Sequence, residues 1–150
     1  MIAKPKKAVE DETNTLDLRK IIVNAKLQGD IDYENRAKRQ LWRLHAIGET
    51  ELERRFGEVM AAYETFLTEK NQRTTHATRT WQKVKNKGVK QALNDWALSK
   101  NATSGFISLI EAGLSDVTAE HLILSMPDEF EPKVVEAARK RLKDHGVIVN

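Results

Sequence analysis

The side chains able to do acid–base or metal chemistry are scattered along this chain rather than gathered into a motif. None of the four histidines lies in an H-x-x-x-H or H-E-x-x-H spacing, which would place two metal ligands on one helical face. The chain has no cysteine, which excludes disulfides, thiolate ligands and a cysteine nucleophile. The glycine-rich nucleotide motifs and the G-x-S-x-G motif of hydrolases are also absent. We therefore expect no cofactor, no metal site and no enzymatic activity. The histidines are His45, His76, His121 and His145.

Two acidic clusters could be taken for catalytic carboxylates or magnesium ligands. Each falls where a helix is expected to begin, and negative charge near a helix N-terminus is favoured by the helix dipole. Helix capping therefore explains both clusters without a catalytic role. Their members are Glu49, Glu51 and Glu53 in the first, and Asp128, Glu129 and Glu131 in the second.

Positive charge is concentrated between residues 73 and 100, which carry seven basic side chains and one acid, Asp95. The rest of the chain is neutral or acidic, so this segment accounts for the whole net charge of +3. On a helix of about 100° per residue, Trp81, Leu93 and Trp96 share the apolar side, and most of the lysines gather on the other. A row of exposed cations is how a helix follows a phosphate backbone.

The basic segment supports an alternative function, a nucleic-acid-associated protein that contacts the phosphate backbone. Its cations could equally be the solvated face of an ordinary amphipathic helix. The last helix could extend this surface if it packs beside the segment. The candidate residues for phosphate contact are Arg79, Lys83, Lys87, Lys90, Arg139 and Arg141.

The segment 105–124 resembles a helix-turn-helix in outline, with Gly113 at the tight turn. Its second helix would offer Asp116, Glu120 and His121 to DNA, and acids facing phosphates are repulsive. We interpret this segment as a short helical corner rather than a DNA reader.

Helix start and stop signals recur along the chain, while two-residue alternation never persists, so the sequence predicts an all-α fold of six to seven helices. A first helix should run from about Thr15 to Leu27 or Gln28, and a second from Asp30 to Gly48. Thr50 and Glu53 form a capping box that opens a third. A basic helix should reach Ser99, unless Gly88 divides it. Shorter helices should follow at 103–112, 115–126 and 132–146.

The third helix carries an apolar stripe in alternating steps of four and three residues. This pattern predicts packing against another helix, which could belong to the same chain, to a second copy or to a different protein. The residues predicted at a partner interface are Leu52, Phe56, Val59, Tyr63 and Phe66.

The sequence divides into a flexible charged tail at 1–13, a helical hairpin subdomain at 14–72, and a basic helix with a small helical subdomain at 73–150. The N-terminus lacks the apolar run of a secretory signal, and no stretch approaches the roughly 20 apolar residues that cross a bilayer. We expect a cytoplasmic, non-catalytic helical interaction protein whose partner is another protein or a second copy of itself, with no membrane partner.

Overall fold

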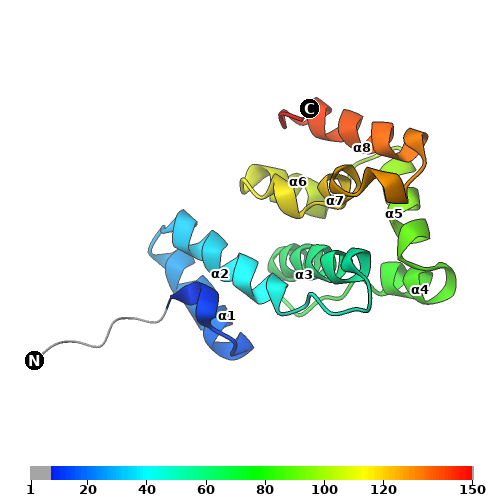
Figure 1. The fold of residues 1–150 in the computed structure, drawn as a ribbon. Coiled ribbons are helices and arrows are strands. Elements are labelled where there is room, and N and C mark those ends of the chain that lie inside the picture. The colour runs from blue at the N-terminus through cyan, green and yellow to red at the C-terminus, as the bar shows by residue number, and fades with distance from the viewer. Residues whose placement is uncertain (1–7, 150) are drawn as a thin grey trace, which may run out of the picture. The chain divides into compact units, whose positions relative to one another are not determined.

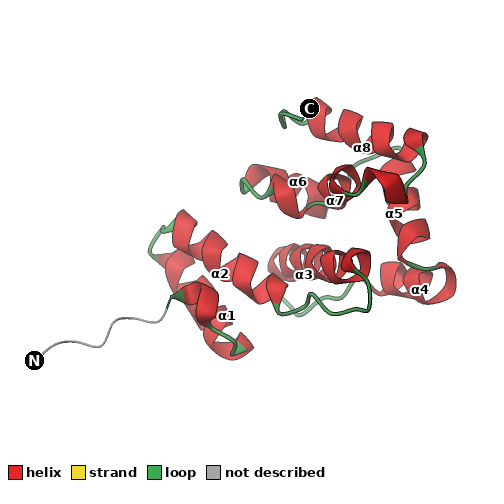
Figure 2. Cartoon of the chain, in the orientation of Figure 1, coloured by secondary structure: helices red, strands yellow, loops and turns green. Residues whose placement is uncertain are grey.

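The computed structural model describes residues 8–149, and all of its regular structure is helical, as predicted (Figure 2). Three short 3-10 helices are η1 (Val9–Asp11), η2 (Ser115–Val117) and η3 (Pro127–Glu129). The α-helices are α1 (Thr15–Leu27), α2 (Ile31–Arg43), α3 (Glu51–Asn71), α4 (Thr78–Lys87), α5 (Val89–Leu98), α6 (Ser104–Glu111), α7 (Ala119–Ser125) and α8 (Pro132–Asp144).

Side-chain caps begin most of these helices, because each offers an oxygen to a backbone N–H that has no partner within the helix. The predicted caps Asp30 and Thr50 are confirmed: they accept from the amides of Tyr33 and Glu53, each at 3.1 Å. The cap of α1 is Asn14, one residue before the expected Thr15. The starts of these helices therefore follow signals in the local sequence, whereas α2 ends at Arg43 and not at the predicted Gly48.

The helix count exceeds the prediction because Gly88 divides the basic segment into α4 and α5. Its backbone has φ +92° and ψ 168°, a conformation that residues other than glycine rarely adopt. The amide of Gly88 still donates to the carbonyl of Val84, at 2.8 Å, and so closes α4. This is the division at Gly88 that the sequence left open.

Contacts divide the chain into two compact units, residues 1–45 and 46–150. This boundary differs from the predicted division at residues 72 and 73, because α3 packs on α5, α6 and α7 and belongs with the C-terminal helices. The helical pair at the N-terminus is α1 with α2. Their buried side chains include Leu18, Ile22 and Leu41.

Part of the segment predicted as a flexible tail is folded onto the first unit. Residues 1–7 lie outside the described residues, but Val9 is only 3% exposed and η1 contacts α2. The Glu10 carboxylate accepts two hydrogen bonds from Arg36, at 2.6 and 2.9 Å. One buried apolar side chain and one bidentate ion pair therefore hold the short 3-10 turn in place.

In the second unit, α7 lies between α3 and α8, and α5 contacts all three (Figure 1). Aromatic rings join α3 to the following helices: Tyr63 stacks on Trp96 with ring centroids 4.7 Å apart, and Phe56 meets Trp81 edge-on at 5.8 Å. Gly105 of α6 lies directly against the Tyr63 ring. The absence of a side chain at this position lets α6 approach α3 closely.

Replacement of Gly105 by alanine should destabilise the second unit. The added methyl would lie 2.1 Å from a ring carbon of Tyr63, which cannot withdraw easily because it is stacked on Trp96. Overpacking of this kind costs about 1–3 kcal/mol of unfolding free energy. Urea denaturation should show this loss for Gly105→Ala, while Ser104→Ala, at the exposed neighbouring position, should not. Equal stabilities for the two variants would contradict the close packing.

Candidate functional site

The cations predicted to contact nucleic acid are mostly engaged by carboxylates of the same chain. Lys83 lies 3.0 Å from Asp95, and Lys90 lies 2.7 Å from Glu129. Arg139 pairs with Glu136 one turn earlier in α8, and Arg141 lies 3.5 Å from Glu120. Four of the six predicted residues are therefore ion-paired within the chain, and these carboxylates offset much of their positive charge.

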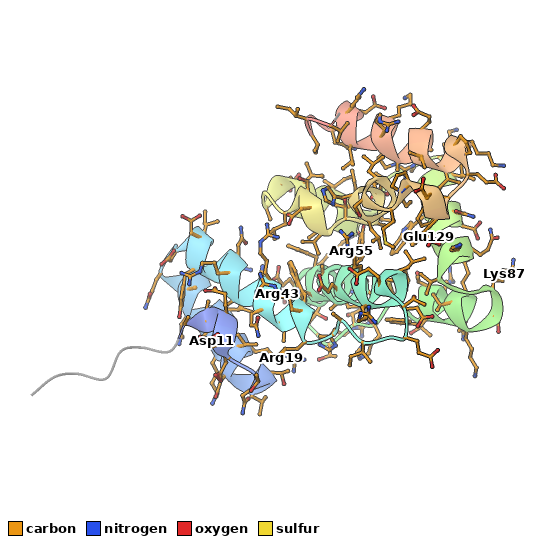
Figure 3. The ribbon with its side chains drawn as sticks, in the orientation of Figure 1. Asp11, Arg19, Arg43, Arg55, Lys87 and Glu129 are labelled. Atoms are coloured by element: carbon orange, nitrogen blue, oxygen red, sulfur yellow. The ribbon has the colours of Figure 1, made fainter. Side chains whose placement is uncertain are left out.

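The other two predicted cations, Arg79 and Lys87, are exposed and form no ion pair among residues 8–149. Both belong to α4, which buries none of its side chains. Figure 3 shows Lys87 at the outer edge of the second unit, near the end of α4. The predicted basic strip is thus reduced to α4, with Lys85 as a third exposed cation.

The apolar stripe predicted to meet a partner is used inside the chain. Leu52, Phe56, Val59 and Tyr63 are between 2% and 7% exposed, and only Phe66 is half-buried. Two of these side chains are covered by Trp81 and Trp96, as described above. The helical periodicity correctly indicated packing, but the packing partners within the second unit are α5, α6 and α7. Most of this stripe is therefore buried within the second unit and is not exposed to a partner.

The helix-turn-helix outline corresponds to a buried corner. The chain turns at Gly113, with φ +77°, and α7 then passes between other helices with Glu120 and Leu122 each 2% exposed. A recognition helix must present its side chains to a groove of DNA. Since α7 presents most of its surface to the protein interior, the geometry agrees with the interpretation as a helical corner.

Arg141 of α8 reaches across the second unit to the C-terminal end of α5. Its guanidinium donates to the carbonyl oxygen of Trp96, at 2.9 Å, and to that of Ser99. Carbonyls in the last turn of a helix have no partner within the helix, and arginine is well suited to bind them. The same guanidinium faces the carboxylate of Glu120 on α7, so one side chain connects α5, α7 and α8.

Burial shapes the acid–base properties around this guanidinium. Burial raises the pKa of Glu120, and the opposing effects of its backbone hydrogen bond and Arg141 are smaller. The pKa of Tyr63 is raised well above its ordinary value, first by burial and then by the negative charge of Glu120. The second carboxylate oxygen of Glu120 has no hydrogen-bond partner. The cluster ties the helices together around a carboxylate that is only partly satisfied.

A groove of about 600 Å³ opens beside Arg141, between the C-terminal end of α5, the start of α6 and α8. Two large apolar side chains in its wall remain open to solvent: Leu98 is 48% exposed and Ile107 is 41% exposed. The charged side chains in its wall are Lys100, Lys140, Arg141 and Asp144, and the imidazole of His145 also lines it. Neither Glu120 nor Tyr63 lines the groove, so the buried carboxylate and the surface hollow are separate features.

Of the groove residues, only Arg141 is among the site residues predicted from the sequence. Leu98 and Ile107 lie out of phase with the buried positions of their helices, which include Leu93 in α5 and Leu109 in α6. An apolar residue outside the helical period is the signal that could have identified them. The signal is weak because single exposed apolar side chains are common on protein surfaces.

The histidines do not converge on a site. His76 contacts Glu64, whose carboxylate also accepts from the amide of Ala77 and the indole of Trp81. Glu64 thus supplies the N-terminus of α4 with the acceptor that its own cap residue lacks. Burial lowers the pKa of His121, whose Nδ1 atom has no partner. Among residues 8–149, no group of three or more His, Cys, Asp and Glu could hold a metal ion.

Comparisons with known proteins give no match to a family model, a curated protein or a solved structure. None of the helices within residues 8–149 combines the length and the apolar character needed to cross a bilayer.

The pH dependence of stability should report the buried state of Glu120. Because its pKa is raised in the folded protein, the native state binds more protons than the unfolded chain from about pH 4.5 upward, and stability falls as pH rises through this window. Glu120→Gln removes that loss. The stability of the variant relative to the wild type should therefore increase with pH in urea titrations across this range, and stay level at lower pH.

Arg141→Gln gives the matched test, because Arg141 lowers the pKa of Glu120 by its charge and its hydrogen bond. In that background the pH window of the Glu120→Gln difference should extend to higher pH. A difference between Glu120→Gln and the wild type that is the same at every pH would exclude a raised pKa at this carboxyl.

Proposed function

We propose that this chain is a non-catalytic interaction protein and that its second unit binds a segment of another protein in the groove formed by α5, α6 and α8. The observation that carries the proposal is the exposure of Leu98 and Ile107 in the wall of one hollow. Apolar side chains that line a concave, solvent-filled surface gain free energy when a partner covers them. The groove volume of about 600 Å³ falls within the usual range for binding sites.

The buried polar groups support a structural rather than a catalytic use of the charged residues. Arg141 is occupied by two carbonyls and Glu120, and the hydroxyl of Tyr63 is surrounded by protein, since Tyr63 is 3% exposed. General acid–base catalysis requires a titrating group within hydrogen-bond reach of a substrate. Neither Glu120 nor Tyr63, whose pKa values are raised, lines the groove. Asp144 does line it, and its hydrogen bond with Lys140 lowers the pKa of this carboxyl, which favours an ion-paired carboxylate.

Peptide display against the purified protein tests the proposal. Peptides selected on the wild type should lose binding to Ile107→Asp, because a carboxylate in the wall would have to be desolvated by an apolar partner. A loss of about tenfold or more is expected for a residue central to an interface. Leu27→Asp is the matched control, since Leu27 is an 80% exposed leucine in α1 outside the groove. Peptides equally sensitive to both variants, or to neither, would contradict binding in the groove.

A second candidate function is contact with a nucleic-acid backbone through α4, favoured by the three exposed cations Arg79, Lys85 and Lys87. Three phosphate contacts predict that log Kd rises against log salt with a slope of about 2 to 3, and the triple alanine variant should abolish this dependence. A gel-shift titration from low to high salt measures it. Absence of any complex at low salt would eliminate this function without affecting the groove.

A further inference from the structure

The groove carries a charge that restricts its partner. Its cations are Lys100, Lys140 and Arg141, and its one carboxylate is Asp144. Lys100 is exposed, and Lys140, with a side chain 77% exposed, reaches Asp144 at 2.8 Å while most of its surface faces solvent. The ring of His145 is held at the end of the groove by an edge contact with Phe106, with centroids 5.0 Å apart.

A second, shallower hollow continues this surface over the outer side of α8. It shares Ala137, Lys140 and Asp144 with the groove, so the two are contiguous. Together they contain six cationic and two anionic side chains. Glu120 and Glu131, which lie outside the two hollows, offset Arg141 and Lys133, and this leaves an excess of two positive charges. The residues added by the second hollow are Lys133, Glu136, Arg139 and Lys143.

The same surface also has an apolar wall. Leu98 and Ile107 are joined in the groove wall by Ala97, Ala102 and Ala137. A phosphate backbone could pair with the cations but has no apolar groups to cover Leu98 and Ile107. A peptide can supply both carboxylates and apolar side chains. The combination of an apolar wall with a cationic surround therefore favours a peptide over a nucleic acid.

We infer that the occupant of the groove is a short acidic peptide segment of another protein, whose apolar side chains cover Leu98 and Ile107 and whose carboxylates face Lys100 and Lys140. This inference rests on the proposed function and adds the chemistry of the partner. Opposite charges at the margin of an interface steer the encounter and select among partners, while the covered apolar side chains supply most of the affinity.

The test uses a groove-dependent peptide from the display selection and measures its affinity for the full chain by fluorescence anisotropy. Three forms are compared: the selected peptide, a form with every Asp and Glu replaced by Asn and Gln, and a form with lysine at those positions. The wild type should bind the acidic form most tightly and the lysine form least. Added salt should reduce the difference in affinity between the acidic and lysine forms, because the charges at the groove margin are exposed and are screened.

The protein variant for this test is the double substitution Lys100→Gln and Lys140→Gln, which removes two exposed charges without opening the core. Affinity for the acidic peptide should fall by about 2- to 30-fold, as expected for two exposed ion pairs, and affinity for the neutral form should stay unchanged. Lys85→Gln on α4 is the matched control, an exposed lysine of the same unit outside the groove, and should leave both affinities unchanged. Circular dichroism confirms that each variant is folded.

Three results would overturn the inference in distinguishable ways. If peptide binding depends on Ile107 but the acidic, neutral and basic forms bind with equal affinity, the partner is not acidic. The proposal that the groove binds a peptide would still hold. Failure to select any peptide that depends on Ile107 would remove the proposed function as well. If no peptide binds but a 20-base-pair DNA duplex does, the variants are compared by their affinity for DNA. An affinity that falls in the double lysine variant and is unchanged in Ile107→Asp would assign the surface to nucleic acid.

Discussion

The second unit depends on the placement of one guanidinium. Arg141 donates to the carbonyls of Trp96 and Ser99 at the end of α5 and faces the carboxylate of Glu120 on α7, so three helices meet at a single side chain. Leaving polar groups unpaired in the interior is more costly than forming one hydrogen bond is favourable. An arginine suits this position because its planar group donates in several directions at once. The end of α5 and the start of α6 are held where the groove lies.

Close packing of helices on the other side completes this arrangement. Gly105 allows α6 to approach Tyr63 of α3, and the same tyrosine is stacked on Trp96, whose carbonyl accepts from Arg141. Trp96 therefore belongs to both the aromatic contact and the polar one. Interiors packed to this density transmit local changes. The positions of Leu98 and Ile107 at the surface follow from these contacts beneath them.

The electrostatic surface that results differs from the one that the charge pattern along the chain indicated. Carboxylates from other elements reach Lys83 and Lys90, among them Glu129 of η3, and so reduce the field of the segment 73–100. An excess of cations instead surrounds α8 and the end of α5, although residues 101–150 carry more acids than bases. Net charge per segment is a poor guide to local potential because exposed charges interact over only about 8–10 Å at moderate salt.

The sequence by itself determined the all-α class, the capped starts at Asp30 and Thr50, and the apolar stripe of α3, because caps and helical periodicity are local properties. The sequence was compatible both with one continuous basic helix and with a division at Gly88, and the structure shows the division. Only the tertiary structure decided which helices cover that stripe, which carboxylates meet Lys83, Lys90 and Arg141, and that Leu98 and Ile107 share a groove. These relations depend on how separate helices pack against one another, and no periodicity or cap signal within a single helix encodes them.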